Sequence, residues 1–378
     1  KPLGPVAVFC ASNFPLAFSV AGGDTASALA AGCPVIVKAH HSHPGTAELV
    51  GQAVLSAVKE CSFPEGTFSL LYGPGRETGQ SLLRHPIIKA AGFTGSREGG
   101  QALMKIAAER ADPIPFYAEM SSINPVFILS GAMAERGEAL ADGLHSSMTM
   151  GVGQFCTNPG LTIVDNNSNL EPFISKLTDL VCSSPSATML NSGIGSAYDS
   201  GANSFNKNKA VETLARGEAG EGDCQAEVLL FRTTSDSFSN DDSLGAELFG
   251  PSTLIVTHDN KDKMLALARS LEGQLTATVH GTDADLVANC DLLEVLETKA
   301  GRVLINGFPT GVEVCHSMVH GGPFPATSDG RSTSVGTNAI DRFSRDVCYQ
   351  SFPDSLLPRE LQEDNPLKIR RMIDGVII

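Results

Sequence analysis

The chain of 378 residues is long enough for about two domains, and its 42% hydrophobic and 18% charged residues are typical of a folded globular protein. It holds no apolar run of about 18 residues, so a membrane-spanning helix is excluded and we predict no membrane partner. The formal net charge of -15 disfavours nucleic acid as a partner, because contacts with phosphate backbones depend on clustered lysines and arginines.

Short apolar runs alternate with longer amphipathic stretches over residues 1–120. Such alternation is typical of a parallel sheet whose strands are joined by crossover helices. Sheets of this kind bind ligands at the carboxyl ends of their strands, so residues that end a strand are the first candidates for a site. The predicted strands are Val6–Cys10, Val35–Lys38, Phe68–Tyr72, Ile87–Phe93 and Ile114–Glu119, and the predicted helices are Ser19–Ala31, Gly45–Cys61, Gly75–Arg84 and Ser96–Glu109.

The alternation continues after a further apolar run at 125–129. A helical stretch from Glu135 to Gly151 and later strand and helix signals, up to about Ile305, predict a second α/β domain over residues 121–325. Residues 191–222 are rich in Gly, Ser and Asn, and we interpret them as a surface helix flanked by loops, without a chemical role. Residues 326–378 form a C-terminal segment, in which 346–352 alternates like an edge strand.

Several candidates for ligand binding follow the strands of the first domain. Lys38 ends its strand, and Arg76 lies in the turn after the next one, so the two cations could converge on one anion such as a ribose 2′-phosphate. Gly95 and Ser96 form a turn in which Ser96 can cap the next helix and offer free backbone N–H groups to a pyrophosphate. The alternatives are a solvated lysine and a plain capped helix.

Three residues could carry catalysis. Cys156 lies in a glycine-bounded loop rather than inside a β-branched run, which suits an exposed nucleophile. Glu119 ends a strand, where a partly buried carboxylate could take a proton from water. Asn13 could donate its amide N–H to an oxyanion. A structural cysteine, a strand-end salt bridge and a turn-stabilising asparagine are the alternative interpretations.

The histidines and cysteines give weaker signals. His40, His41 and His43 could bind zinc together with Cys33 or Cys10, but their spacing matches no finger pattern and we expect no metal. His316 and His320 flank a Gly-Gly-Pro turn; either could line a pocket, and we favour His316. The nine cysteines have no CxxC spacing, which indicates a reducing compartment and predicts a cytoplasmic protein.

Taken in order, these segments resemble the aldehyde dehydrogenase superfamily over essentially the whole chain. The resemblance implies an α/β fold with a Rossmann-type cofactor domain over 1–120, a catalytic domain over 121–325 and a C-terminal segment over 326–378 that returns to the core and carries an oligomerisation strand. It rests on six motifs: Asn13-Phe14-Pro15, Lys38, Phe93-Thr94-Gly95-Ser96, the loop from Glu119 to Pro125, Gly153-Gln154-Phe155-Cys156, and Glu247-Leu248-Phe249-Gly250-Pro251.

The resemblance also implies a mechanism. The Cys156 thiolate would attack an aldehyde, with the Asn13 amide and the Cys156 backbone N–H as oxyanion hole, and Glu119 would activate the water that releases the acid. Glu247 would hold the nicotinamide ribose and Phe249 would pack on the nicotinamide. Lys38 and Ser96 would hold the adenine-side ribose and the pyrophosphate.

One departure concerns the cofactor. Most members carry Lys-Pro-x-Glu at the adenosine ribose, where the glutamate repels a 2′-phosphate. Here the stretch is Lys38-Ala39-His40-His41, with His41 in place of the glutamate and Arg76 as a nearby cation. We therefore expect NADP as cofactor, with NAD possible.

A second departure is at the start, where family members carry a longer segment; part of the cofactor domain is expected to be missing. Residues 306–314 and 320–328 are similar to the branch containing 2,5-dioxopentanoate dehydrogenases and an NADP-dependent fatty-aldehyde dehydrogenase. We expect oxidation of 2,5-dioxopentanoate to 2-oxoglutarate, with fatty aldehydes, or nucleotide binding without turnover, as alternatives. Phe14, Phe155 and Phe308 are expected to line the substrate pocket. By analogy the full-length protein would be a homodimer or homotetramer.

Overall fold

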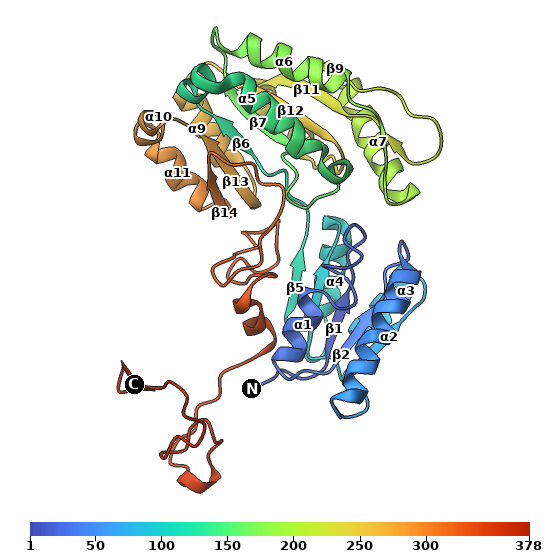
Figure 1. Ribbon diagram of the computed structural model, residues 1–378, viewed down its shortest axis with the longest axis vertical. Coiled ribbons are helices and arrows are strands. Elements are labelled where there is room, and N and C mark those ends of the chain that lie inside the picture. The colour runs from blue at the N-terminus through green and yellow to red at the C-terminus, as the bar shows by residue number, and fades with distance from the viewer.

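The computed structural model describes residues 1–378 and shows two α/β domains followed by a largely irregular C-terminal segment (Figure 1). No helix is both long and apolar enough to cross a membrane. The α/β class predicted from the sequence is confirmed, because each domain is built on a mainly parallel sheet that carries helices.

The first domain is a five-stranded parallel sheet with strand order β3-β2-β1-β4-β5. Alternate residues of β1 enter two different cores: Val6 and Val8 belong to one cluster, whereas Ala7 and Phe9 belong to another. Side chains of a strand alternate between its faces, so both faces of this sheet are covered. The elements are β1 Val6–Phe9, β2 Val35–Lys38, β3 Phe68–Leu71, β4 Ala90–Thr94, β5 Phe116–Glu119, α1 Gly23–Ala30, α2 Pro44–Glu60, α3 Gly75–Arg84 and α4 Arg97–Ala108.

The second domain is a seven-stranded sheet with strand order β14-β13-β6-β7-β12-β11-β9, in which only β9 is antiparallel. Its strands are β6 Val126–Ile128, β7 Leu161–Asp165, β9 Glu212–Arg216, β11 Leu229–Thr234, β12 Ser252–His258, β13 Gln274–His280 and β14 Ala300–Ile305. Its helices are α5 Ser130–Thr149, α6 Leu170–Cys182, α7 Ser192–Lys207, α8 Ser235–Ser239, α9 Lys261–Ser270, α10 Asp283–Ala288 and α11 Cys290–Glu297. Strands β8 Ala187–Thr188 and β10 Gln225–Ala226 form a small separate ladder.

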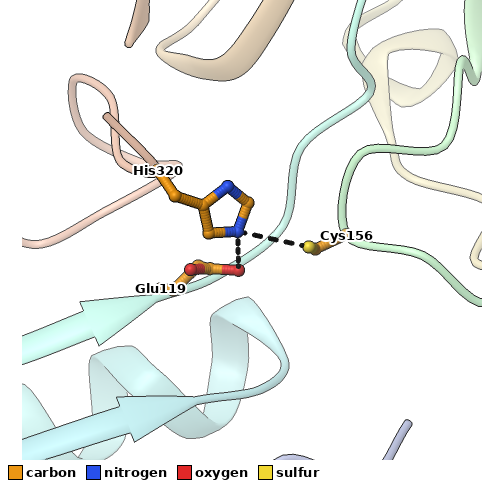
Figure 2. A group of neighbouring side chains, drawn as sticks. All are labelled: Glu119, Cys156 and His320. Carbon is orange, nitrogen blue, oxygen red and sulfur yellow. Dashed lines mark hydrogen bonds and ion pairs between the residues drawn. The ribbon is translucent and has the colours of Figure 1, made fainter. Parts of the chain in front are cut away.

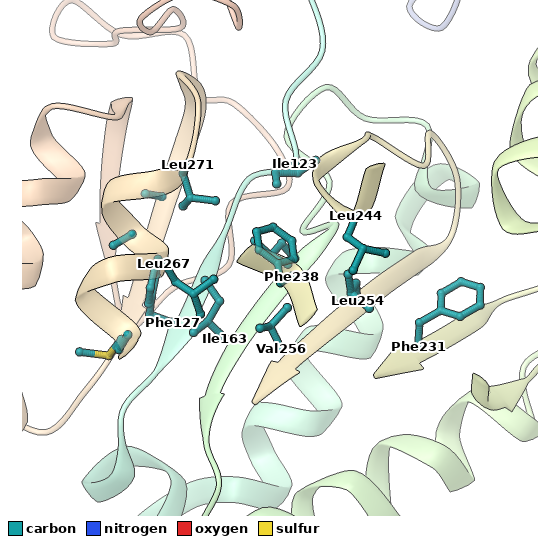
Figure 3. Packing of buried hydrophobic residues seen from close by; sticks show 14 of the residues in the cluster. Ile123, Phe127, Ile163, Phe231, Phe238, Leu244, Leu254, Val256, Leu267 and Leu271 are labelled. Carbon is teal, nitrogen blue, oxygen red and sulfur yellow. The ribbon is translucent and has the colours of Figure 1, made fainter. Parts of the chain in front are cut away.

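The core of the second domain also lies on both faces of its sheet. Leu254 and Val256 of β12 belong to the larger cluster, and Ile255 between them belongs to the other. Figure 3 shows part of the larger cluster, with Phe127 and Ile163 of neighbouring strands close to side chains of α9. The cluster supports the amino end of β13 and the loop before β6, where Gln274 and Thr276 bond Ser122 and Asn124 next to the site.

The chain after β14, residues 306–378, returns to the first domain, and this whole stretch is called the C-terminal segment from here on. Thr327 forms an isolated bridge with Glu119, and the 3₁₀ helix η3 (Thr337–Phe343) packs against α1. A buried ion pair joins Arg342 to Asp24 of α1, with 2.7 Å between Nη1 and Oδ1. This segment therefore ties the two domains together and brings its own residues to the end of β5.

The last residues extend away from both domains (Figure 1) and end in a hairpin of β15 (Met372–Ile373) and β16 (Val376–Ile377). Residues 346–352 form no strand within the chain. Because an edge strand that joins subunits needs a second copy as its partner, the predicted oligomerisation strand stays a prediction.

Candidate active site

A cavity of about 740 Å³ lies where strands of the first sheet end, and both domains contribute to its wall. Ten of the predicted site residues line it: Asn13, Lys38, His41, Arg76, Gly95, Ser96, Glu119, Cys156, Glu247 and Phe249. The two α/β domains and the C-terminal segment thus bring together residues that are far apart in the sequence.

Three side chains from three different parts of the chain meet beside the cavity (Figure 2): Glu119 and Cys156 line it, and the buried His320 contacts both of them from behind. Glu119 ends β5, Cys156 lies in the loop after the 3₁₀ turn η1 (Met150–Gly153), and His320 comes from the C-terminal segment. His320 Nε2 lies 3.4 Å from Cys156 Sγ and 3.0 Å from Glu119 Oε1. One ring nitrogen therefore faces both the thiol and the carboxylate.

That nitrogen can play opposite roles toward its two neighbours. When it carries no proton, Nε2 of His320 can accept a hydrogen bond from the Cys156 thiol; when it is protonated, it donates to the Glu119 carboxylate. His320 is held in place through its backbone, because its N–H donates to Thr333 Oγ1 at 2.9 Å and its carbonyl accepts from Ser334 N at 2.9 Å. The arrangement can move the thiol proton toward the histidine.

Glu119 is almost fully buried, with 2% of its surface exposed, yet it is set up to stay ionised. Burial raises the pKa of its carboxyl, but the charge and hydrogen bond of His320 and a hydrogen bond from Ser334 lower that pKa by more, so it lies below its ordinary value. Ser334 Oγ donates to Oε2 at 2.9 Å. The carboxylate is thus a base at neutral pH.

The surroundings of Cys156 have the opposite effect, because they favour the neutral thiol over the charged thiolate. Its low-polarity surroundings and the neighbouring Glu119 carboxylate raise the pKa of the thiol well above its ordinary value. Without substrate or cofactor the cysteine therefore rests as a thiol at neutral pH, and it becomes nucleophilic only when a base such as His320 takes its proton.

This electrostatic arrangement predicts how alkylation of Cys156 depends on pH. In the free protein the rate with iodoacetamide should keep rising beyond pH 9, because the thiolate forms only there. In Glu119→Gln the profile should move to lower pH, since the negative charge that opposes the thiolate is gone. The rate is measured by mass spectrometry of the Cys156 peptide. Equal profiles for the two proteins would contradict the assigned role of the Glu119 charge.

The backbone before Cys156 adopts an uncommon conformation. Gly151, Val152 and Gly153 have φ values of 58°, 60° and 64°. Left-handed conformations are costly for a β-branched residue such as Val152, by about 1–3 kcal/mol, and persist where the surroundings fix them. The turn projects the next residues, and with them the sulfur, toward the cavity.

The side chain of Asn124 stabilises the loop that carries Cys156. Its amide Nδ2 donates to the carbonyls of Cys156 and Asn158, both at 2.9 Å, and its Oδ1 accepts from Ser122 and from Thr276 of β13. It is fully buried and has a φ of 48°. Asn124 was not among the sequence-based candidates, although its position in the glutamate loop, before Pro125, was a usable signal.

The cysteine loop also touches the loop that carries Glu247 and Phe249. A Cβ at Gly153 would collide with the backbone of Gly250, so only glycine fits there. Burial raises the pKa of Glu247 to about 7, partly offset by hydrogen bonds from Ser121 and from the Ser122 backbone. A carboxylate of this kind is placed to accept hydrogen bonds from hydroxyl groups.

Asn13 lies next to the nucleophile loop, as predicted. Its Nδ2 donates to the carbonyl of Gln154 at 2.9 Å, and the second N–H of the amide stays available to another acceptor. Because Asn13 and Cys156 line the same cavity, the amide can serve an oxyanion that forms beside the sulfur.

The other end of the cavity is built for an anion. Lys38 is only 6% exposed and lines the cavity, and burial lowers the pKa of its ammonium. Arg76 opens α3 at the rim, and its exposed pair with Glu98 at 3.6 Å is weak enough to be exchanged for a ligand. His41 stacks on His40 with 4.3 Å between ring centroids.

The Gly95-Ser96 turn caps α4 as predicted. Ser96 is the N-cap residue, and its Oγ accepts a hydrogen bond from Gly99 N at 3.2 Å. A Cβ at Gly95 would approach the Phe93 ring to 2.8 Å, so glycine lets the chain pass close to that ring. Free N–H groups of the first helical turn face an anion that enters here.

Helix α7 contributes to the cavity in a way that the sequence analysis did not anticipate. Gly193, Ile194 and Ala197 line the wall, and Asn191 Nδ2 donates to Ser42 Oγ across the two domains at 2.8 Å. The sequence pattern of residues 191–222 predicts a surface helix without a chemical role, whereas the structure places α7 in the wall of the cavity. Its small residues are what allow a ligand to lie against the helix.

None of the four predicted substrate-pocket residues, Phe14, Phe155, Phe308 and His316, lines the cavity. His316 is exposed and bonds Thr337 Oγ1 through Nδ1 at 2.7 Å, so His320 is the histidine of the site. Phe308 packs on His280, with 4.6 Å between ring centroids, and against Gly143 of α5. Neither His316 nor Phe308 lines the cavity.

Phe14 and Phe155 form a wall beside Cys156. Their rings meet edge to face with 5.1 Å between centroids, and Phe14 also contacts Phe18, whose ring lies 5.9 Å from that of His320. Among His, Cys, Asp and Glu, the one group compact enough to hold a metal ion is Glu119, Cys156 and His320, whose ligand atoms lie within 4.8 Å of one another. The three histidines at 40–43 do not form such a group.

Comparisons with known proteins agree with the site. The sequence profile of the aldehyde dehydrogenase family matches residues 1–344. Over 373 residues the chain is 54% identical to "alpha-ketoglutaric semialdehyde dehydrogenase 2" of Azospirillum brasilense, covering 99% of this chain and 71% of that protein. Over 376 residues it is 49% identical to "alpha-ketoglutaric semialdehyde dehydrogenase" of Acinetobacter baylyi, with the same coverage of 99% and 71%.

Among solved structures, the glyceraldehyde-3-phosphate dehydrogenase GapN from Methanocaldococcus jannaschii, complexed with NADP, has a TM-score of 0.76 at 19% identity, covering 91% of this chain and 72% of that one. This likeness shows the shared fold. The chain belongs to the aldehyde dehydrogenase family and is an oxidoreductase that acts on aldehydes. The family uses NAD(P).

Proposed function

We propose that this chain oxidises 2,5-dioxopentanoate to 2-oxoglutarate and prefers NADP as the electron acceptor. The observation that carries the chemistry is the meeting of Cys156, His320 and Glu119 beside the large cavity. The names of the two relatives at 54% and 49% identity support the substrate, because both are alpha-ketoglutaric semialdehyde dehydrogenases.

The first step is addition of the Cys156 sulfur to the aldehyde carbon. When His320 Nε2, at 3.4 Å, carries no proton, it takes the thiol proton as the S–C bond forms, and the carbonyl oxygen becomes an oxyanion; the protonated ring then donates to Glu119 Oε1. The second amide N–H of Asn13 and the backbone N–H of Cys156 stabilise that oxyanion. A nicotinamide held by Glu247 and Phe249 would supply the hydride acceptor for this adduct, and oxidation of the adduct would leave a thioester on Cys156.

Glu119 acts as the general base in hydrolysis of the thioester. The carboxylate removes a proton from a water molecule while the water oxygen attacks the acyl carbon, and the S–C bond breaks to return the thiol and the acid. The depressed pKa of Glu119 keeps it ready as a base, and Ser334 and the ring of His320 orient it.

The residues of the cavity fit an NAD(P) molecule. The buried Lys38 ammonium lines the cavity, Gly95 lets the backbone pass closely, and Ser96 begins a helix whose N–H groups suit a pyrophosphate. Glu247 and Phe249 stand on the side of Cys156 and would hold the nicotinamide ribose and ring.

The substrate is tested by comparing kcat/KM for 2,5-dioxopentanoate with that for decanal, using NADPH formation as the readout. We expect 2,5-dioxopentanoate to be the better substrate. A higher kcat/KM for decanal would leave the proposed mechanism unchanged and would identify fatty aldehydes as the substrates. Binding of NADP without turnover of either aldehyde would indicate a nucleotide-binding protein instead.

Arg76 is the residue that we expect to select NADP. Its charge lies at the rim of the cavity, which His41 also lines, and His41 stands in the sequence where most family members have the glutamate that repels a 2′-phosphate. Glu98 also lines the cavity, and its exposed pair with Arg76 can be exchanged for a phosphate. Arg76→Ala should raise KM for NADP about tenfold and leave KM for NAD nearly unchanged, as expected for the loss of one charged contact.

A matched control is Arg84→Ala, which removes an arginine from the last turn of the same helix, outside the cavity. It should leave KM for both cofactors unchanged. An equal rise in KM for NAD and NADP in Arg76→Ala would contradict recognition of the 2′-phosphate, and a wild-type preference for NAD of more than about tenfold would contradict the cofactor proposal itself.

A further inference from the structure

A second, much smaller cavity shares Glu119 with the large one. Its volume is about 10 Å³, and Glu119 is the one residue that lines both cavities. A space of this size admits about one water molecule, provided that polar groups surround it. Only one of the lining residues is hydrophobic, and the C-terminal segment contributes His320, Asp329 and Arg342 to the wall. The Glu119 carboxylate therefore stands between the reaction space and a separate space that suits a water molecule.

The small cavity leads from a buried carboxylate to a partly exposed one. At the end of β5, Glu119 is bridged with Thr327 of the C-terminal segment. The next residue, Ser328, donates its backbone N–H to the Ala118 carbonyl at 3.0 Å, which holds the segment beside the strand. Asp329 then lines the cavity, with 23% of its side chain exposed, whereas 3% of the Glu119 side chain is exposed. One water molecule and the Asp329 carboxylate would thus connect Glu119 with solvent.

Asp329 is suited to accept a proton from such a water molecule. Hydrogen bonds from the exposed Arg331 lower the pKa of its carboxyl, so the group is ionised at neutral pH. Arg331 donates three N–H groups to the carboxylate, which has about four acceptor positions, so one remains for water. Arg342 also lines the cavity, and its Nη1 donates to Asp24 Oδ1 at 2.7 Å, which fixes the guanidinium in the wall. An arginine has five N–H donors, so this side chain can also orient the water.

The proposed reaction leaves one proton on Glu119 in every cycle. During hydrolysis Glu119 takes a proton from water, and as the S–C bond breaks His320 returns the thiol proton to Cys156. The acid departs, but the Glu119 carboxyl stays protonated and cannot act as a base in the next hydrolysis. This proton must therefore leave a side chain that is almost fully buried. Exit through the large cavity would depend on what occupies it, whereas the small cavity offers a separate route.

We propose that this proton leaves through the small cavity, from Glu119 to one water molecule and from that water to Asp329, which releases it to solvent. The water gains the proton of Glu119 and gives one of its own to the Asp329 carboxylate, so it is unchanged after each transfer. The inference rests on the proposed function, in which Glu119 is the general base. Asp329 does not line the large cavity, so it acts on the reaction only through Glu119.

Asp329→Asn tests this path, because the amide keeps the shape of the side chain but cannot take up the proton. With enzyme in excess over aldehyde, each site reacts once with Glu119 already ionised, so thioester hydrolysis should proceed at the wild-type rate. With aldehyde in excess, steady-state NADPH formation should fall about tenfold, the effect expected for one charged hydrogen-bonded group. The Cys156 thioester should then accumulate from the second cycle onward. Rapid acid quench and mass spectrometry of Cys156 measure the thioester.

Two further variants separate proton transfer from support of the structure. Arg331→Ala removes the 3.0 Å ion pair of Asp329 but keeps the carboxylate, so its single-turnover and steady-state rates should equal those of the wild type. Asp329→Glu keeps a proton acceptor and should recover part of the steady-state rate that Asp329→Asn loses. Circular dichroism and thermal unfolding establish that each variant is folded.

Slow thioester hydrolysis already in the single turnover of Asp329→Asn would assign Asp329 to support of Glu119 and overturn the proposal. An unchanged steady state in this variant, or an equal loss in Arg331→Ala, would overturn it as well. The aldehyde used is whichever of 2,5-dioxopentanoate and decanal the wild type oxidises faster, so a wrong substrate assignment leaves the test intact. If Glu119→Gln hydrolyses the thioester as fast as the wild type, the proposed role of Glu119 falls, and the proton path falls with it.

Discussion

Replacing Cys156 by alanine should lower aldehyde oxidation by about 10⁵-fold or more, because the covalent route is lost with the sulfur. The variant should bind NADP as the wild type does, since the cofactor contacts of the cavity come from other residues, such as Lys38 and Ser96. The measurement is a stopped-flow record of NADPH formation with 2,5-dioxopentanoate, paired with equilibrium titration of the cofactor.

The structure supplies a matched control for this variant. Cys10 lines the same cavity but is buried among apolar side chains, and burial raises the pKa of its thiol. Cys10→Ala should keep a burst of NADPH, whereas Cys156→Ala should show none. A burst in Cys156→Ala would assign the nucleophile to another residue and would remove the central element of the site.

Glu119→Gln should separate the two halves of the reaction. The amide cannot take a proton from water, so turnover after the first cycle should fall about 100-fold to 1000-fold. Formation of the first equivalent of NADPH should survive, because the thiol proton goes to His320 and removal of the Glu119 charge makes the thiolate easier to form. Stopped-flow absorbance resolves the burst from the steady state.

The thioester that accumulates in Glu119→Gln can be trapped by acid quench and detected as a mass increase on Cys156. Ser334→Ala provides the graded control, because it removes one hydrogen bond to the Glu119 carboxylate without removing the base. It should slow the steady state far less than Glu119→Gln does. Loss of the burst in Glu119→Gln would show that the carboxylate, rather than His320, activates the thiol.

Much of the fold could be predicted because local patterns and the global fold agree. Strand β2 and helix α3 have the predicted bounds, and most other elements of the first domain differ at their ends by a few residues. The strand predicted from Ile87 begins only at Ala90, because residues 86–87 form a turn before the sheet starts. A run of apolar residues does not show at which residue a strand begins to pair with its neighbours.

The parts that the sequence could not predict depend on contacts between distant segments. Strand β9 follows α7 in a stretch rich in Gly, Ser and Asn, and it pairs antiparallel with β11 only because the sheet offers an edge there. His320 and His316 look alike as loop histidines, and only the path of the C-terminal segment decides which one reaches Glu119.

The sequence predicted which residues line the cavity where a residue ends a strand or lies in a distinctive motif. Glu119 and Lys38 are examples, since the direction of a parallel sheet places the ends of its strands at one edge. Asn124 acts through neighbours on other strands and loops. Its partners are far apart in the sequence, so no local sequence pattern predicts its role.

The backbone contact between Gly153 and Gly250 limits how this active site can change. The segment that presents the attacking sulfur and the segment that would hold the reduced or oxidised nicotinamide touch without any intervening side chain. Because no side chain lies between the two segments, a displacement of one would move the other. The position of the Cys156 sulfur is therefore expected to be coupled to the position of the loop that carries Glu247 and Phe249.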